Sequence, residues 1–481
     1  MSQPTSLTPP SAADWTRLDT LIVTVLTALA GVLRFRGITK VRDLVFDEFY
    51  ASDACLYVLG PHGHCFTSTE ISVAHPPLGK WLIGVGIRVF GFTPAGWRVA
   101  PLVAGTLSVT VLYLLARRLL GSTLAASLAA GLLAFDFLHF VMSRTAMLDV
   151  FVVFFGLLSF LCLLYDRDRD DATQPGLRRP VLQQLRERPW LLGAGLAGGA
   201  AIACKWSGVY LLAVVAVLAF VHGAARRRET QRYRQVAREQ GGLLLIALLL
   251  LPAVVYVVSY AGILDGRLLA WPWKHESWIQ AFVVRQHFML EHHTGALYTH
   301  PYSSPAWSWL LIKRPVLFYF RNLGGGSYQE VLALGNPMVW WSGLLALGTT
   351  TWRLLRLRSI QAPETIIVAG FAAGYVPWLL ITRQEAFLYY VLPAVPFMCL
   401  ALAHVVVSIS SRSIRAITLG GLIVASIGVF SFFQPILVGS SLSYHQWERR
   451  IWFKNCGLSV SDVPMKPVTR QLPPPAGWCW L

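Results

Sequence analysis

The chain has 481 residues, of which 55% are hydrophobic and only 14% are charged, and its mean hydropathy is +0.54. Because soluble globular proteins carry about 25% charged residues, this composition excludes an ordinary soluble enzyme and indicates an integral membrane protein. The net charge of +17 does not indicate a nucleic-acid-binding protein, since the basic residues lie in short segments between apolar blocks, where they orient a membrane protein.

Eleven apolar blocks follow one another along the chain, and a bilayer-spanning helix takes about 20 such residues. They predict an all-α polytopic membrane protein. Residues 1–17, rich in Pro and Ser, are expected to form a disordered cytoplasmic segment. The first block is too long for a signal peptide and lacks a cleavage site after it, so it is expected to remain as a membrane helix. The blocks are 18–35, 98–116, 123–142, 146–165, 190–204, 206–222, 241–261, 335–352, 364–381, 387–408 and 415–434.

The loop charges predict which way these helices run. With the N-terminus inside, every short basic cluster falls on the cytoplasmic side, as the positive-inside bias requires. The opposite side receives a first large loop, 36–97, a second, 262–334, and the C-terminal tail, 435–481. The weakest point is the pair 190–204 and 206–222, because merging these two short blocks would reverse everything downstream. The cytoplasmic basic residues are Arg117 and Arg118, those within 166–189 and 223–239, Arg353, Arg356, Arg358, Arg412 and Arg415.

The cysteines agree with this orientation. Cys55 and Cys65 share the first outside loop, and Cys456 and Cys479 share the outside tail. Paired cysteines confined to one face suit an oxidising compartment, so we expect the disulfides Cys55–Cys65 and Cys456–Cys479, although the sequence alone does not decide the connectivity. The other three lie in apolar blocks and are expected to be small buried hydrophobic residues: Cys162, Cys204 and Cys399.

The first outside loop carries two adjacent carboxylates, Asp47 and Glu48, between aromatic residues. Charge at a membrane surface is costly unless it is used or paired. Neighbouring side chains on a helix diverge by about 100 degrees, so the two would rarely share one task. One would face a substrate hydroxyl while the other anchors the loop or orients a partner. The alternative interpretation is a solvated acidic helix start.

A second cluster in the same loop runs from His75 through two prolines and Gly79 to Lys80. The prolines favour an extended approach, and Lys80 would lie near the lipid headgroups. There it would bind a lipid phosphate as a point charge or, as the alternative, reach the interface as an ordinary snorkelling lysine.

Four more ionisable residues stand at the edges of apolar blocks on the outer side. Arg144 and Asp149 bracket one tight turn, and they are interpreted either as functional groups or as an ion pair that pins the turn. Lys205 and Arg383 are isolated cations near the same face.

The second outside loop, 262–334, is rich in Trp and His, and includes the adjacent pair His292 and His293. No cysteine accompanies these histidines, and adjacent histidines lack the i,i+4 spacing of a helix-borne zinc pair. We therefore predict no metal site. Trp and Tyr favour the membrane interface, so an aromatic loop lying along the membrane surface is the preferred interpretation.

Taken in order, these motifs resemble the protein O-mannosyltransferase family, and most closely its actinobacterial branch. The second loop is too short for the β-trefoil MIR domain of eukaryotic members, which leaves acceptor recognition less constrained. The motifs are Asp47-Glu48, His75-Pro76-Pro77-Leu78-Gly79-Lys80, Arg144-Thr145-Ala146-Met147-Leu148-Asp149, Cys204-Lys205-Trp206-Ser207-Gly208, His300-Pro301-Tyr302-Ser303-Ser304, Gly335-Asn336-Pro337, and Arg383 followed by Phe387-Leu388-Tyr389-Tyr390-Val391-Leu392-Pro393.

The resemblance implies a class-C glycosyltransferase (GT-C) fold over residues 18–434, with amphipathic helices in the outside loops. It also implies transfer of mannose from polyprenyl phosphate mannose to Ser or Thr hydroxyls of secreted proteins. In that reaction Asp47 would be the general base that takes the hydroxyl proton, and Glu48 its supporting partner. The remaining candidates are expected to bind the substrate, with Arg144, Lys80 and Arg383 stabilising the phosphate: Arg144, Lys80, Arg383, His75, Asp149 and Tyr390.

Direct displacement with one base predicts inversion, from a β-linked donor to an α-mannoside. A glycosidase would instead need two carboxyl groups about 5 Å or more apart across the bond. The expected location is the cell membrane, with the active site on the extracytoplasmic face. Contact with the Sec translocon would suit an enzyme that modifies unfolded exported chains, and is retained as an expectation.

Two other functions fit parts of the sequence. A GT-C transferase acting on a lipid or a cell-wall glycan, such as an aminoarabinose or arabinose transferase, would use the same acid and phosphate-binding residues. A transporter is disfavoured, because transporters bind substrates near the bilayer midplane with broken helices, whereas the ionisable residues here gather at the outer face.

Overall fold

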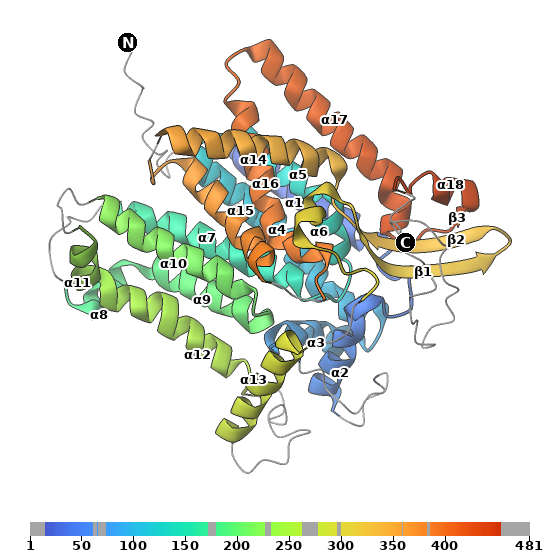
Figure 1. Ribbon diagram of the computed structural model, residues 1–481, viewed down its shortest axis with the longest axis horizontal. Helices are drawn as coiled ribbons and strands as arrows, with labels where there is room; N and C mark the ends of the chain where they lie inside the picture. The colour runs from blue at the N-terminus through green and yellow to red at the C-terminus, as the bar shows by residue number, and fades with distance from the viewer. Residues whose placement is uncertain are drawn as a thin grey trace.

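The computed structural model describes residues 15–60, 65, 74–171, 179–226, 232–261, 278–295, 300–357, 359–381 and 385–453. Within them the protein is a bundle of long helices, and a small β-sheet lies toward one end of the bundle (Figure 1). The first 14 residues, on which most of the prediction for 1–17 rests, lie outside these ranges.

All eleven predicted apolar blocks are helical, which confirms the polytopic helical bundle. Eight helices in the described ranges are long and apolar enough to cross a membrane. The helices that correspond to the blocks are α1 (Arg17–Phe35), α4 (Pro94–Leu120), α5 (Thr123–Ala134), α6 (Phe137–Met142), α7 (Asp149–Asp171), α9 (Pro189–Cys204), α10 (Gly208–Ala225), the successive α11 (Arg232–Leu245), η3 (Ile246–Leu250) and α12 (Leu251–Val258), α14 (Pro337–Leu357), α15 (Pro363–Leu380), η5 (Leu388–Ala394) with α16 (Val395–Val407), and α17 (Arg412–Leu437).

The block predicted over 123–142 is divided into α5 and α6. Asp136 lies at the break, and its Oδ1 accepts a hydrogen bond from the backbone N–H of His139 at 2.9 Å, so it caps α6. Its Oδ2 accepts a hydrogen bond from Trp340 Nε1 at 2.8 Å. The carboxylate is fully buried, and these bonds provide the partners that a polar group needs in such a place.

The short blocks 190–204 and 206–222 are two separate helices, α9 and α10. Lys205 adopts an extended conformation and ends α9. At Gly208 a Cβ atom would lie 2.6 Å from the backbone of Ala201, so the turn between the helices closes tightly only because glycine stands there. The two helices therefore form a hairpin, so the two short blocks are not merged into one helix.

Buried ion pairs tie the helices together at the end that carries the basic segments. Arg117 Nε donates to Asp19 Oδ1 at 2.9 Å and joins α4 to α1. Arg188 pairs with Asp166 where α9 begins beside the end of α7. A short helix, α8 (Val181–Glu187), precedes α9 at this end.

The first large loop, 36–97, which is predicted to lie outside, contains a 3₁₀-helix, η2 (Phe46–Phe49), followed by α2 (Tyr50–Leu59) and α3 (Leu78–Phe90). The predicted disulfide Cys55–Cys65 is present and anchors residue 65 to α2. The other predicted pair, Cys456–Cys479, lies outside the described residues.

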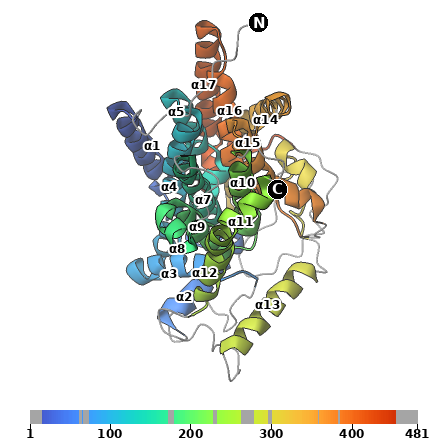
Figure 2. The ribbon, with the colours of Figure 1, turned by 90° about the vertical axis from the view of Figure 1, so that its left-hand side faces the viewer.

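The second large loop, 262–334, which is also predicted to lie outside, contains α13 (Trp278–Thr294), a 3₁₀-helix η4 (Ala306–Leu311), and an antiparallel hairpin of β1 (Val316–Gly324) and β2 (Ser327–Ala333). The short β3 (Leu442–Ser443), followed by α18 (Tyr444–Glu448), adds a third strand in the order β1-β2-β3. Helices α2, α3 and α13 lie at the same end of the bundle in both views (Figures 1 and 2).

This sheet was not predicted from the sequence. Residues 316–320 are buried without alternation, because the strand is covered on both faces. A continuous apolar run of this length does not distinguish a strand from a helix segment.

Candidate active site

Asp47 lies in η2, twelve residues after the last residue of α1, in a half-buried position. Tyr389 belongs to η5, far from Asp47 in the sequence, and its Oη donates a hydrogen bond to Asp47 Oδ2 at 3.0 Å. The other carboxylate oxygen, Oδ1, has no hydrogen-bond partner in the described part of the chain. The carboxylate is therefore held in place at one oxygen while the second remains available to a substrate.

The backbone just before Asp47 is strained. Phe46 has φ = +42°, a left-handed conformation that costs a non-glycine residue about 1–3 kcal/mol. Its ring is stacked on Phe318 of β1, with centroids 5.0 Å apart, and lies edge-on to Phe387 at 5.6 Å. These aromatic contacts keep the unusual backbone in place, and thereby determine the direction in which Asp47 points.

Glu48, the other member of the acidic pair, is fully buried and completely bonded. Arg98 of α4 grips it through two bonds, from Nε to Oε1 at 2.7 Å and from Nη2 to Oε2 at 2.6 Å. Its oxygens also accept the backbone N–H groups of Val45 and Ala146, each at 2.9 Å. With four bonds already made, Glu48 anchors the loop and has no oxygen free for chemistry.

Arg98 extends the same anchor along the chain. Its Nη1 donates to the carbonyls of Ile38 at 3.0 Å and Val41 at 2.7 Å, and its Nη2 to that of Asp43 at 3.0 Å. One buried side chain of α4 thus fixes most of the segment that connects α1 to Asp47. The role of Arg98 was not predicted from the sequence, because an arginine near a helix start shows nothing of its partners.

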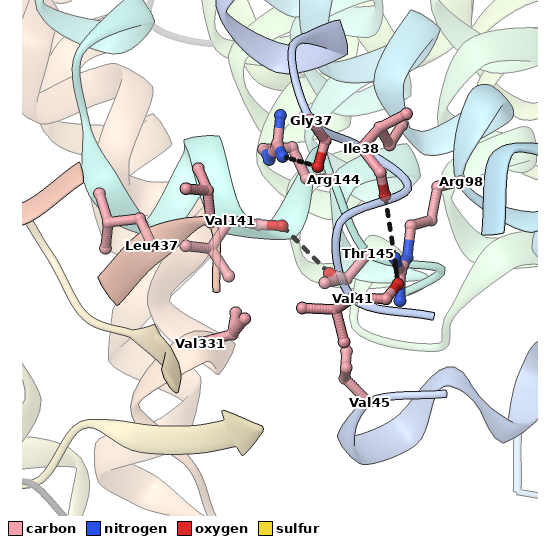
Figure 3. Close-up of a pocket in the computed structure, with 11 residues that line it drawn as sticks. Gly37, Ile38, Val41, Val45, Arg98, Val141, Arg144, Thr145, Val331 and Leu437 are labelled. Atoms are coloured by element: carbon pink, nitrogen blue, oxygen red, sulfur yellow. Dashed lines mark hydrogen bonds between the residues drawn. The ribbon is translucent and has the colours of Figure 1, made fainter. Parts of the chain in front are cut away.

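The guanidinium of Arg144 is also hydrogen-bonded to backbone carbonyls. It donates to the carbonyls of Arg34, Arg36 at 2.9 Å and Gly37 at 3.0 Å, and so caps the C-terminal end of α1. Arg98 and Arg144 both line a small cavity between this segment and the turn before α7, and the bonds drawn in Figure 3 lead from them to the segment 37–41. Arg144 does not pair with Asp149, contrary to the ion-pair interpretation of that turn.

Asp149 pairs instead with Lys205. Lys205 Nζ lies 2.9 Å from both carboxylate oxygens of Asp149, which brings together the start of α7 and the end of α9. The ammonium group also lies over the ring of Tyr390, 4.5 Å from its centroid, and 5.7 Å from that of Tyr389, the residue that holds Asp47. The structure therefore gathers Asp47, Asp149, Lys205 and Tyr390 at one place.

Burial raises the pKa of Asp47 to about 6. The hydrogen bond from Tyr389 and the charge of Lys205 act in the opposite direction, and the negative charge of Asp149 adds to the increase. A carboxyl group with such a pKa is ionised at neutral pH but is a much better proton acceptor than an ordinary surface aspartate.

Lys80 and His75 lie beside this group of residues, where both contact the ring of Tyr50. Lys80 is fully buried and pairs with Asp53 of α2 at 2.7 Å, so it is not a snorkelling lysine. Burial lowers its pKa, and the charge of Asp53 partly opposes this effect. The ring of His75 lies 5.5 Å from that of Tyr50.

Arg383 lies outside the described residues. Within the described part of the chain, no group of three or more His, Cys, Asp or Glu side chains is close enough to hold a metal ion. The adjacent His292 and His293 lie on α13 with their rings edge to face, 5.3 Å apart.

Two family descriptions match the sequence. Residues 24–261 match "Dolichyl-phosphate-mannose-protein mannosyltransferase", and residues 278–456 match "C-terminal four TMM region of protein-O-mannosyltransferase". The two matches together leave only the chain ends and a short internal segment uncovered.

Known proteins give the same indication. A polyprenol-phosphate-mannose–protein mannosyltransferase of Mycobacterium tuberculosis is 30% identical, over 92% of this chain and 93% of its own length. The Pmt1-Pmt2 protein O-mannosyltransferase complex of Saccharomyces cerevisiae, solved with its sugar donor, contains a chain that superposes with a TM-score of 0.75 at 17% identity, covering 93% of this chain and 94% of that one. ArnT of Cupriavidus metallidurans follows with 0.56 at 17% identity, covering 88% and 77%.

The anchor role of Glu48 predicts a loss of stability when the pair with Arg98 is broken. Glu48→Gln leaves a buried guanidinium without its counter-charge, which we expect to lower the free energy of unfolding by about 3–5 kcal/mol. The midpoint of thermal unfolding in detergent measures this loss. As a control, Glu187→Gln, which removes an ion pair with Arg179 at the surface, should leave the midpoint unchanged.

Arg98→Met should be destabilising as well, and the double variant should cost no more than Arg98→Met alone, because the pair can be lost only once. A Glu48→Gln protein as stable as the unmodified one would show that Glu48 is not an anchor.

Proposed function

Because this chain belongs to the protein O-mannosyltransferase family and has its GT-C fold, it transfers mannose from a lipid-linked donor to protein, and we propose that Asp47 is the general base of that transfer. The observation that carries the proposal is the contrast between two neighbouring carboxylates. Glu48 has both oxygens bonded within the protein, whereas Asp47 keeps one oxygen available and has a pKa raised to about 6.

The reaction that fits this arrangement is a single displacement. The Asp47 carboxylate accepts the proton of a Ser or Thr hydroxyl while the hydroxyl oxygen attacks the anomeric carbon of mannose. The bond from that carbon to the phosphate oxygen breaks, and its electron pair leaves with polyprenyl phosphate. Attack opposite the leaving group inverts the sugar carbon, so a β-linked donor gives an α-mannoside.

Lys205 is the cation best placed to stabilise the departing phosphate. It stands at the end of a membrane helix, which is where the headgroup of a lipid held in the bilayer would arrive, and it is adjacent to Tyr389 and hence to Asp47. A positive charge prearranged near a leaving phosphate lowers the barrier to its departure. Lys80 and Arg383 are proposed as supporting cations, and Arg144 as a residue that positions the loop.

The active site is proposed to face the extracytoplasmic side of the cell membrane. Asp47 follows α1, Asp149 begins α7, Lys205 ends α9 and Tyr389 lies at the start of η5. In an alternating bundle these four positions share one side, and the basic segments occupy the other, which the positive-inside bias assigns to the cytoplasm. The acceptors are then exported proteins, and association with the Sec translocon stays a prediction.

The alternative of a lipid or glycan acceptor is supported by the fold, which ArnT shares at a TM-score of 0.56, and by a sequence match to an aminoarabinose transferase that covers only 34% of this chain. The identity with the mycobacterial protein mannosyltransferase extends over nearly the whole chain and favours a protein acceptor.

Asp47→Asn is expected to reduce transfer of radiolabelled mannose from polyprenyl phosphate to a Ser/Thr peptide by about 10²–10⁴-fold, the usual contribution of a general base. In the unmodified protein the rate should rise with pH through an apparent pKa of about 6 and then level off, because only the ionised carboxylate accepts a proton.

Stability separates this loss from misfolding. The folded state raises the pKa of Asp47, so the contribution of this group to stability is present at low pH and is lost as the pH rises through about 6. At neutral pH Asp47→Asn should therefore be as stable as the unmodified protein or more so. Asp43→Asn, at an exposed carboxylate in the same loop, is the matched control and should remain active; full activity of Asp47→Asn would disprove the proposed base.

Lys205→Met is expected to lower transfer by about 10²–10³-fold. Lys205→Met also leaves the buried carboxylate of Asp149 without its counter-charge. The control is therefore the double variant Lys205→Met/Asp149→Asn, which removes both charges of the pair. The double variant should recover thermal stability and remain inactive, whereas recovery of activity would mean that Lys205 serves only to neutralise Asp149.

We also propose that Lys205 takes the place of a divalent cation, so excess EDTA in the same assay should leave the rate of the unmodified protein within about twofold of its value without EDTA.

Membrane orientation can be tested with a membrane-impermeant maleimide on intact cells. In a chain with Cys456 and Cys479 replaced by Ser, Asp43→Cys should be labelled from outside, and Ser359→Cys, between α14 and α15, only after the membrane is permeabilised. Labelling of residue 359 but not residue 43 in intact cells would place the site in the cytoplasm.

A further inference from the structure

We propose that His300 is a neutral hydrogen-bond donor that binds a backbone carbonyl of the acceptor polypeptide and so positions its hydroxyl beside Asp47. The inference rests on the proposed function, because it assigns a residue to the acceptor side of the same site. The mechanism above leaves His300 unused, although it lies in the aromatic cluster next to the base.

The His300 ring is part of the wall that holds Phe46 in its strained conformation. Its centroid lies 5.7 Å from that of Phe46 and 5.1 Å from that of Phe387. Phe387 in turn is stacked on Tyr389, the residue that donates to Asp47. His300 therefore stands at the edge of the site, in direct contact with Phe46 and separated from Tyr389 by one aromatic ring, that of Phe387.

The segment that carries His300 is attached firmly to η5. The backbone N–H of Ser304 donates to the carbonyl of Ala386 at 2.9 Å, and the N–H of Ala386 donates to Ser303 Oγ at 3.0 Å. The backbone N–H of Ser303 donates to the carbonyl of His300 at 2.8 Å, which closes a turn. Because these bonds hold the segment against the start of η5, the position of the ring is fixed relative to Tyr389.

The hydrogen bonding of the ring determines where its proton lies. His300 Nδ1 accepts the backbone N–H of Tyr302 at 3.1 Å, so in the neutral ring the proton resides on Nε2. Within the described residues Nε2 has no hydrogen-bond partner, and the side chain is only half-buried. In the described residues the ring thus has a single N–H group that is available to a ligand, and it belongs to a side chain that contacts Phe46, the residue before Asp47.

The group is uncharged under physiological conditions. Burial lowers the pKa of His300 to about 4, and the positive charge of Arg314 adds to this effect. A neutral N–H can hydrogen-bond an oxygen without attracting the phosphate of the donor, which leaves the phosphate to the cations of the helix ends.

The position of His300 in the chain points to the acceptor rather than to the lipid donor. Lys205 and Asp149 come from the ends of membrane helices, where a lipid headgroup arrives. His300 comes from the second outside loop, together with the hairpin that supplies Phe318. A backbone carbonyl is the acceptor group that every polypeptide offers, so a donor of this kind recognises a protein chain without regard to its sequence.

The test compares three substitutions in the purified full-length protein, using polyprenyl phosphate mannose and a Ser/Thr peptide. His300→Gln keeps an N–H donor near the position of Nε2, His300→Asn keeps a donor that is one methylene too short, and His300→Phe keeps the aromatic packing without a donor. We expect KM for the peptide to rise about tenfold in His300→Phe and His300→Asn, and less than about threefold in His300→Gln, as for the loss and retention of one hydrogen bond. KM for the lipid donor should stay unchanged in all three.

Equal peptide KM values in the unmodified protein and in both His300→Phe and His300→Asn would overturn the inference, as would a rise confined to the KM for the lipid donor. If His300→Phe does not fold, as judged by thermal unfolding, the comparison of His300→Asn with His300→Gln decides the question. Failure of the proposed function gives a different result, because the unmodified protein would then transfer no mannose to the peptide, or Asp47→Asn would transfer it normally.

Discussion

The bidentate contact between Arg98 and Glu48 is the interaction on which the geometry of the site depends. A buried carboxylate and a buried guanidinium are each expensive to remove from water, and the expense is offset only because every oxygen of Glu48 is bonded and the guanidinium reaches three backbone carbonyls as well. The contact joins α4 to the loop after α1 and, through the N–H of Ala146, to the turn before α7. Contacts from three separate parts of the sequence therefore fix the position of η2.

Once Glu48 is fixed, its neighbour has little freedom. Asp47 and Glu48 are consecutive residues of a 3₁₀-helix, so their side chains point in different directions. The side chain of Glu48 points toward Arg98, and that of Asp47 points toward η5. The left-handed backbone of Phe46 is tolerated because its ring fits among Phe318, Phe387 and His300. Strain at one residue is thus maintained by aromatic packing contributed from three distant segments, and it aims the carboxylate of Asp47 at the ends of the membrane helices.

The sequence was sufficient for the features that depend on hydropathy and loop charge. Eleven apolar blocks correspond to helices in the structure, because a bilayer leaves an apolar segment no alternative that satisfies its backbone. The break at Asp136 and the hairpin of β1 and β2 were not predicted. Both depend on burial against other segments: Asp136 caps a helix only where Trp340 also reaches it, and β1 is covered on both faces, which removes the alternation that would have identified a strand.

The charged residues of the site show that a charge beside an apolar block predicts where a functional site lies better than it predicts the role of each residue in it. Asp47, Glu48, Arg144, Asp149 and Lys205 were all recognised as costly charges at the ends of apolar helices on one side, and all lie at the same end of the bundle. Their partners could not be inferred, since a guanidinium is satisfied equally well by a carboxylate, a phosphate or the carbonyls at a helix end. Arg144 meets the carbonyls that end α1, whereas the compact ammonium group of Lys205 meets a carboxylate across two helices. Which cation remains beside the base is therefore decided by the crossing of α7 and α9, a property of the whole bundle that no local motif contains.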